Sequence, residues 1–421
     1  MKIAVWHHLP SGGAKRALFY HVRGLVERGH TVESWCPETA EASYLPLSTL
    51  VPEHIRPLRW QRSAPRSRIG ALVASYRNVI GQVEAMAEHC RACADEMRSK
   101  DFDVLFANGS RFLATSPMGR HVDFPKVLYL NEPYRFLHEA RPRLPWIALP
   151  PSQGSPWRPR NIWRTVNDLV RVQGLRVQYR EEVLNAAGFD ALLVNSLFSR
   201  ENVLRIYGID AKVCYLGVDC EVFVDRNQER ESFLVGVGAF VPGKNIELAL
   251  AAVGRIPRPR PPLVWIGNAA QDAYLGRLRY RAEELDVDFR PRVRIRDGEL
   301  VEVLNRASVF VATPRLEPFG LAPLEANACG LPVVAVSEGG LRETIFDGVN
   351  GLLVPPAVTE LTAGIRQLIE RPDVARQLGR RARRYVQERW NLPAAIERLE
   401  AHFAEVIARR NERHSGIGTG V

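Results

Sequence analysis

The sequence predicts an α/β protein built from two doubly wound domains, each with a parallel sheet covered by helices. Apolar runs of strand length alternate with segments of helical periodicity in two successive series, which is the pattern of repeated β-α-β units. A charged, poorly periodic stretch, 221–231, separates the two series. At 421 residues the chain exceeds one typical domain, and each half can bury a core of its own. We therefore expect one domain over residues 1–220 and a second over 221–390.

The first series begins at the N-terminus. Residues 2–6 predict a buried parallel strand, and the loop after this strand contains Gly12 and Gly13. A helix with one apolar stripe follows and is expected to end at Gly29. Paired glycines let a backbone turn sharply and approach a ligand closely, although a tight turn alone explains them equally well. Further strands are predicted at 31–35, 104–106, 127–130 and 191–194.

The second series begins with a strand predicted at 233–238. The loop after it contains Lys244, directly ahead of a helix that starts at Ile246. A lysine in such a loop can neutralise a diphosphate, although Lys244 taken alone is explained as a solvated surface lysine. Further strands are predicted at 263–266, 309–311, 333–336 and 352–354.

Bulk composition is that of a globular protein, with 46% hydrophobic and 25% charged residues. No apolar run approaches the roughly eighteen residues of a membrane span, and no apolar secretion signal precedes the first strand. Cys90 and Cys93 form a lone C-x-x-C, which favours coincidence over a metal site. The D-x-D sequences at 101–103 and 286–288 precede predicted strands and are expected in turns. We expect a cytoplasmic protein with no essential metal and no cofactor.

Positive charge is concentrated in one segment. The chain carries a net charge of +10, and residues 134–180 hold nine arginines against Glu139 and Asp168. Tryptophans are interleaved with these arginines, and this combination suits contact with an anionic membrane surface. A flexible loop with solvated charge is the alternative. Nucleic acid is not an expected partner, because no basic helix with groove-reading spacing is visible.

The most informative segment runs from Glu317 to Glu325, eight residues further on. It follows a predicted strand, turns helical from Ala322, and has Gly330 where a helix C-cap belongs. A strand-to-helix loop presents free N–H groups and the positive end of a helix dipole, which suits phosphate or sugar oxygens. Carboxylates in turn pair well with sugar and ribose hydroxyls. Taken alone, each glutamate is better explained as a surface or capping residue.

This segment resembles the E-x7-E motif of retaining glycosyltransferases of the GT-B fold, specifically glycosyltransferase family 4. The shared residues are a Glu-Pro-Phe-Gly start at Glu317, a Leu-Glu-Ala-x-Ala-x-Gly-x-Pro-Val-Val continuation through Glu325, and the later segments 339–343 and 347–354. The resemblance covers nearly the whole chain. It implies a GT-B architecture with the site in the cleft between the domains, and a C-terminal helix, 391–421, that crosses back to the first domain.

The resemblance also implies an activity in glycan or polysaccharide biosynthesis. A hexose would move, with retention, from a nucleoside-diphosphate sugar to a saccharide or a lipid-linked acceptor. Glu325 would hold the ribose hydroxyls, Lys244 would hold the diphosphate, and Gly12 and Gly13 would stand in the loop that closes over donor and acceptor. The sugar and the distal phosphate would be held by Glu317 and by the backbone of Phe319, Gly320 and Leu321.

Two positions depart from the family pattern. Ala239 stands where the family has an arginine that clamps the diphosphate together with the lysine. A neighbouring arginine substitutes, leaving-group stabilisation is weaker, or the chain has lost catalysis. Asn131 stands near the position of a sugar-contacting histidine, and its amide can form hydrogen bonds but cannot act as an acid or base. The alternatives are therefore a non-catalytic sugar-nucleotide or polyanion-binding protein, and a sugar-nucleotide hydrolase or epimerase of the same fold.

Overall fold

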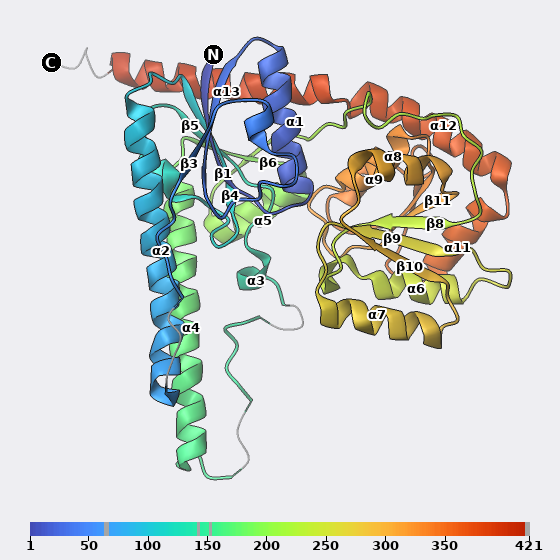
Figure 1. The fold of residues 1–421 in the computed structure, drawn as a ribbon, viewed down its shortest axis with the longest axis horizontal. Coiled ribbons are helices and arrows are strands. Elements are labelled where there is room, and N and C mark those ends of the chain that lie inside the picture. Colours follow the sequence, from blue (N-terminus) through green and yellow to red (C-terminus); the bar gives the residue numbers. More distant parts are fainter. Residues whose placement is uncertain (63–66, 141–143, 151–153, 417–421) are drawn as a thin grey trace.

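The computed structural model describes residues 1–62, 67–140, 144–150 and 154–416, and this part of the chain forms two parallel sheets (Figure 1). One sheet has seven strands in the order β3-β2-β1-β4-β5-β6-β7, and the other has six in the order β10-β9-β8-β11-β12-β13. In both, the chain starts in the middle, winds to one edge, and then crosses to fill the other side. The prediction of two doubly wound α/β domains is confirmed.

The elements of the first domain alternate as the hydrophobic pattern predicts. Its strands are β1 (Lys2–His8), β2 (Thr31–Pro37), β3 (Glu53–Arg56), β4 (Val104–Ser110), β5 (Lys126–Tyr129), β6 (Ala191–Val194) and β7 (Lys212–Val213). Its helices are α1 (Gly13–Glu27), α2 (Arg68–Arg98), α3 (Arg135–His138), α4 (Pro159–Ala187) and α5 (Leu197–Tyr207), joined by the C-terminal α13 (Leu392–Gly416).

The first sheet is buried on both faces. Ile3 and Val5 of β1 belong to the apolar cluster formed with α1 and α13. Ala4 and Trp6 belong to the opposite cluster, formed with α2 and α5. This two-sided burial explains why the first strand is continuously apolar rather than alternating.

The second domain repeats the arrangement. Its strands are β8 (Leu234–Val237), β9 (Leu263–Gly267), β10 (Phe289–Val293), β11 (Val309–Ala312), β12 (Val333–Val336) and β13 (Leu352–Val354). Its helices are α6 (Ile246–Gly254), α7 (Asp272–Glu284), α8 (Asp297–Arg306), α9 (Leu321–Ala328), α10 (Leu341–Thr344), α11 (Val358–Ile369) and α12 (Pro372–Arg389). Figure 1 shows α6 and α7 on one face of the sheet and α8 and α9 on the other.

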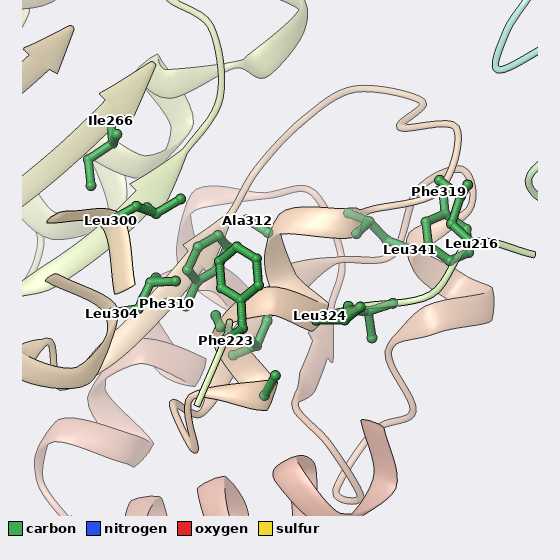
Figure 2. Close-up of a cluster of buried hydrophobic side chains, with 14 of the residues drawn as sticks. Leu216, Phe223, Ile266, Leu300, Leu304, Phe310, Ala312, Phe319, Leu324 and Leu341 are labelled. Atoms are coloured by element: carbon green, nitrogen blue, oxygen red, sulfur yellow. The ribbon is translucent and has the colours of Figure 1, made fainter. Parts of the chain in front are cut away.

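Two segments join the domains. After β7 the chain places Phe223 in the apolar cluster of the second domain, together with Phe310 and Leu304 (Figure 2). After α12, α13 returns to the first domain, where Phe403 packs against Phe106 with ring centroids 5.3 Å apart. The two sheets are thus connected by continuous apolar packing rather than by a flexible linker.

A long helical hairpin projects from the first domain. Helix α4 packs along α2, and the pair extends well beyond the sheet (Figure 1). Close packing depends on Gly174, because a β-carbon there would lie 3.3 Å from Cγ2 of Val79. The alternative of a flexible loop is therefore wrong for residues 159–180, which form α4. Residues 141–143 and 151–153 of the same segment lie outside the described residues.

The docking of α13 on α1 can be tested at Gly24. A β-carbon on Gly24 would lie 2.6 Å from Cγ1 of Ile396. We expect Gly24→Ala to lower the free energy of unfolding by about 1–3 kcal/mol, measured by urea denaturation, because the contact becomes overpacked. Ile396→Ala in the same background should recover part of this loss.

Gly276→Ala on α7 is the matched control. Gly276 is also a helical glycine, but a β-carbon there would meet no atom within 4 Å. This variant should gain up to about 1 kcal/mol from improved helix propensity. If both glycine variants were equally stable, the tight contact between α1 and α13 would be refuted.

Candidate active site

The loop between β1 and α1 lies open at the carboxyl edge of the first sheet. Gly12 adopts φ 149° and ψ −169°, a conformation available essentially only to glycine. A β-carbon on Gly12 or Gly13 would meet no atom within 4 Å. The backbone at both positions is therefore accessible, as a ligand-covering loop requires. Their role in binding stays a prediction.

Lys244 and Glu317 form an ion pair across two loops of the second domain. The Nζ of Lys244 donates to Oε2 of Glu317 over 2.7 Å. The lysine stem packs on Gly238, where a β-carbon would lie 3.0 Å from Cδ of Lys244. Both side chains are only partly buried. The structure thus brings together two of the residues predicted to act on the donor.

The backbone around Glu317 is held rigidly by the loop that contains Gly339 and Gly340. The N–H of Gly340 donates to the carbonyl of Glu317 over 2.7 Å. A β-carbon on Gly339 would lie 2.3 Å from that carbonyl oxygen, and one on Gly340 would lie 2.2 Å from the carbonyl oxygen of Pro318. Larger residues would displace the Glu317 loop, so both glycines serve to position it.

Phe319 and Gly320 lead from this loop into α9. The Phe319 side chain is buried against Trp390, with ring centroids 5.5 Å apart, so only its backbone can face a ligand. Gly320 has φ 99° and precedes Leu321, the first residue of α9. The free N–H groups at this helix start remain the predicted contacts for sugar and phosphate oxygens.

Glu325 lies deeper, next to a buried arginine of the first domain. Arg16 of α1 donates two hydrogen bonds to Asp297 of α8, at 2.6 and 3.0 Å, and its Nε lies 3.3 Å from Oε1 of Glu325. The Nε is not aligned for a hydrogen bond, so Oε1 is buried without a donor among the described residues. Burial raises the pKa of Glu325, and Arg16 partly offsets this effect. An unpartnered buried oxygen of this kind suits a ligand hydroxyl.

The first domain contributes a second group of residues after β5. The carbonyl of Asn131 accepts a hydrogen bond from Ser199 over 3.3 Å. The adjacent Glu132 is 42% exposed, yet the surrounding cleft desolvates its carboxyl group and raises the pKa to about 7. Its charge interacts with Glu317 and Lys244, so the side chain faces the second domain. Asn131 therefore lies in the first domain, directly after β5, and its contact with a sugar stays a prediction.

Arg135 connects the two domains. It belongs to α3, and its Nη2 donates to the carbonyl of Arg315 in the second domain over 3.0 Å. Arg16, Asp297, Glu132 and Arg135 were not predicted as site residues. Arg16 was detectable in principle, because it lies about one helical turn beyond Gly12 and Gly13. Nothing in the sequence pattern indicates that Asp297 lies beside it, since 281 residues separate the two.

A cavity of about 710 Å³ opens beside the Arg16–Asp297 pair. Its walls come from both domains and include Ser11, Tyr44, Arg111, Asn268, Arg294 and Asp297. A second cavity, of about 410 Å³, lies between the 225–232 segment and α12. Neither cavity is lined by a predicted site residue. The first cavity is the better candidate for a phosphate-bearing ligand, because both domains line it and Asp297 in its wall is bonded to Arg16, which lies beside Glu325.

Potential metal ligands come together at one place in the described part of the chain. His7, Cys36 and Glu53 offer ligand atoms that all lie within 4.8 Å of one another. They are buried beneath α1, and Nε2 of His7 already lies 3.2 Å from Glu53. The charge of the buried Lys15 also acts on Glu53 and Cys36 and would oppose a bound cation. This cluster is therefore better explained as a buried polar network than as a metal centre.

Comparison with known proteins relates the chain to glycosyltransferases. Residues 221–385 match the family model of glycosyl transferases group 1. The chain is 33% identical over 236 residues to a D-inositol 3-phosphate glycosyltransferase of Saccharomonospora viridis, a match that covers 50% of this chain and 54% of that protein. It is 36% identical over 110 residues to the alpha-1,3/1,6-mannosyltransferase ALG2 of Rhizomucor pusillus, covering 26% and 24% of the two chains. These matches span a quarter to about half of the curated relatives.

Solved structures match over nearly the whole chain. Sucrose-phosphate synthase from Thermosynechococcus elongatus superposes with a TM-score of 0.70 at 20% identity, covering 97% of this chain and 99% of that one. Anabaena HepE, solved with UDP-glucose, superposes with a TM-score of 0.64 at 18% identity, covering 97% and 100%. This likeness shows the fold, which is GT-B. Lys244, Glu317 and Glu325 lie inside the family match, whereas Gly12, Gly13 and Asn131 lie outside it.

The buried bridge at Arg16 makes a testable contribution to stability. Arg16→Ala would leave Glu325 and Asp297 as uncompensated carboxylates, both largely shielded from solvent. We expect a loss of about 3 kcal/mol in the free energy of unfolding, measured by urea denaturation.

Arg306→Ala is the control for this prediction, because the ion pair of Arg306 with Glu231 is solvent-exposed. That variant should stay within about 0.5 kcal/mol of the parent. A similar small change for Arg16→Ala would mean that the bridge does not hold the domains together.

Proposed function

We propose that the protein is a retaining, metal-independent glycosyltransferase. It moves a hexose from a nucleoside-diphosphate sugar to a saccharide or lipid-linked acceptor in glycan or polysaccharide biosynthesis. The observation that carries this proposal is the pairing of Lys244 with Glu317, 2.7 Å apart, in the same domain as the buried Glu325 of α9. The family match over this domain supports it, as do a relative named as a mannosyltransferase and a neighbour solved with UDP-glucose.

The residues divide the work between binding and charge stabilisation. Glu325 accepts hydrogen bonds from the ribose hydroxyls through its unpartnered Oε1. Glu317 and the backbone from Phe319 to Leu321 hold the hexose and the distal phosphate. As the bond from the anomeric carbon to the diphosphate oxygen breaks, Lys244 stabilises the negative charge that develops there.

The acceptor approaches from the side of Asn131. Its hydroxyl oxygen bonds to the anomeric carbon, and its proton passes to the departing diphosphate, so no enzymic base is needed. The amide of Asn131 orients the sugar by hydrogen bonding. A hydrolase or epimerase of the same fold would use the same donor contacts, and a non-catalytic protein would bind the donor without turnover. A hydrolase or epimerase would thus differ from a transferase in its products, and a non-catalytic protein would form no product.

The donor site is tested first by thermal shift with UDP, GDP, ADP and their sugars. We expect one nucleotide to stabilise the protein by about 2.7 kcal/mol at a hundredfold excess over its dissociation constant. Glu325→Ala should abolish this shift and raise the donor KM strongly, whereas Lys244→Ala should mainly lower kcat. Wild-type kinetics in both variants would remove the assignment.

Product analysis in the same assays separates the alternatives. Glycosylated acceptor supports transfer. Donor consumption without a glycosylated product would indicate hydrolysis or epimerisation. Nucleotide binding without consumption of the donor, for every acceptor tested, would favour a non-catalytic binding protein.

The acceptor side carries a surface suited to a membrane. None of the helices in the described ranges is long and apolar enough to cross a bilayer. At the outer end of the α2–α4 hairpin, however, Trp157 is 81% exposed and Leu169 is 64% exposed. Exposed Arg158, Arg160 and Arg164 lie between them. We infer that this end rests on an anionic lipid surface at the cytoplasmic face, because aromatic side chains settle at headgroup depth while arginines meet the lipid charge.

Vesicle co-sedimentation tests this contact. We expect the protein to bind vesicles containing phosphatidylglycerol but not vesicles of phosphatidylcholine alone. Replacing Trp157 and Leu169 by alanine should weaken binding at least tenfold, since each buried aromatic or leucine side chain contributes about 1.5–3 kcal/mol.

Tyr280→Ala is the matched control, because Tyr280 is an exposed aromatic flanked by Arg279 and Arg281 on α7 of the second domain. Its binding should equal that of the wild type. Equal binding to both vesicle types, or an equal effect of Tyr280→Ala, would contradict docking through the hairpin.

A further inference from the structure

A cation of the first domain reaches into the loops that carry the predicted donor site. Arg135 donates from Nη2 to the carbonyl of Arg315, and the N–H of Arg315 in turn donates to the carbonyl of Gly243 over 2.9 Å. A β-carbon on Gly243 would lie 3.8 Å from Nη1 of Arg135. The guanidinium therefore lies directly beside the loop that presents Lys244.

Part of this guanidinium is free to bind. Its Nε donates to Glu139 over 2.8 Å and lies 3.7 Å from Glu132, while Nη2 is occupied by Arg315. Nη1 donates no hydrogen bond within the described part of the chain. The charge of Arg135 also interacts with that of Glu317, which lies two residues after Arg315 in the sequence. An arginine with free N–H groups beside a lysine is a suitable site for phosphate oxygens.

The loop that presents Lys244 needs a second positive charge to bind a diphosphate. A nucleoside diphosphate carries more than one negative charge, whereas the loop from Gly238 to Lys244 offers only the lysine, because position 239 is alanine. The Arg315 side chain is directed to Glu338, to which its Nη1 donates over 2.8 Å, whereas the Arg135 guanidinium is the one that lies against Gly243. Arg135 is the neighbouring arginine whose remaining N–H groups face this loop.

Building on the proposed function, we propose that Arg135 supplies the second diphosphate-binding cation and so replaces, from the opposite domain, the charge that Ala239 lacks. It acts together with Lys244 on the oxygen that leaves the anomeric carbon. The diphosphate displaces Glu132, whose Oε2 lies 3.7 Å from Nε of Arg135. The hydrogen bond from Arg135 to Glu139 keeps the guanidinium oriented. The donor site is then complete only when the two domains are in contact.

The experiment compares wild type, Arg135→Ala, Arg135→Lys and the double variant Arg135→Ala/Ala239→Arg. We expect Arg135→Ala to lower kcat about 100-fold, as the loss of one charge-stabilising donor does. It should weaken binding of the nucleoside diphosphate identified by thermal shift at least tenfold, but leave binding of the matching monophosphate unchanged. Arg135→Lys should keep part of the activity, and Ala239→Arg should restore turnover in the double variant.

Arg366→Ala is the matched control, because Arg366 also donates from Nε to a glutamate four residues on, Glu370, over 2.7 Å but lies on the exposed side of α11. It should behave as wild type. Unchanged kcat in Arg135→Ala would overturn the proposal. Equal loss of monophosphate and diphosphate binding, without rescue by Ala239→Arg, would also overturn it, since Arg135 would then only hold the domains together. A wild type that binds no nucleoside diphosphate would refute the proposed function itself.

Discussion

The structure depends on one buried cation that belongs to both halves of the molecule. Arg16 extends from α1 of the first domain into the second, where Asp297 and Glu325 surround it. A guanidinium cannot lose its proton, so burying it away from solvent requires carboxylates close by. Those carboxylates come from α8 and α9, whose positions are set by the apolar core around Phe310. The charge thereby joins the two domains, which also share a continuous apolar cluster.

Ion pairs also involve the other charged residues of the candidate site. Lys244 is paired with Glu317, Arg135 with Glu139 and Glu132, and Arg16 with Asp297. A ligand that enters must exchange these pairs rather than add to them. Phosphate oxygens can replace carboxylates on the cations, and hydroxyl groups can then donate to the carboxylates released. Only a ligand with both kinds of group, as a nucleotide sugar has, satisfies both sides of the exchange.

Much of the fold and part of the candidate site could be predicted from the sequence. The contacts between the two domains could not, for a physical reason. The strands, the two sheets and the Lys244–Glu317 neighbourhood follow from periodicity and from the motif around Glu325, because they depend on contacts between adjacent β-α units. Arg16–Asp297 and Arg135–Arg315 join segments 281 and 180 residues apart, and their geometry exists only once the domains have docked. Helix α4 was not predicted for another reason: Trp163 and the many arginines of this helix give a weak apolar pattern, and α2 packs beside it only in the folded structure.

The location of Arg135 changes what the missing arginine at position 239 implies. An arginine within the Gly238–Lys244 loop would bind phosphate whatever the first domain did. A cation on α3, as we propose for Arg135, does so only when the two domains are in contact, as the hydrogen bond to the Arg315 carbonyl shows them to be. Leaving-group stabilisation thus becomes conditional on domain contact, and this condition disfavours cleavage of the donor in an open cleft that water can enter. Under this proposal the alanine at position 239 is compatible with catalysis, and the first domain takes part in donor chemistry.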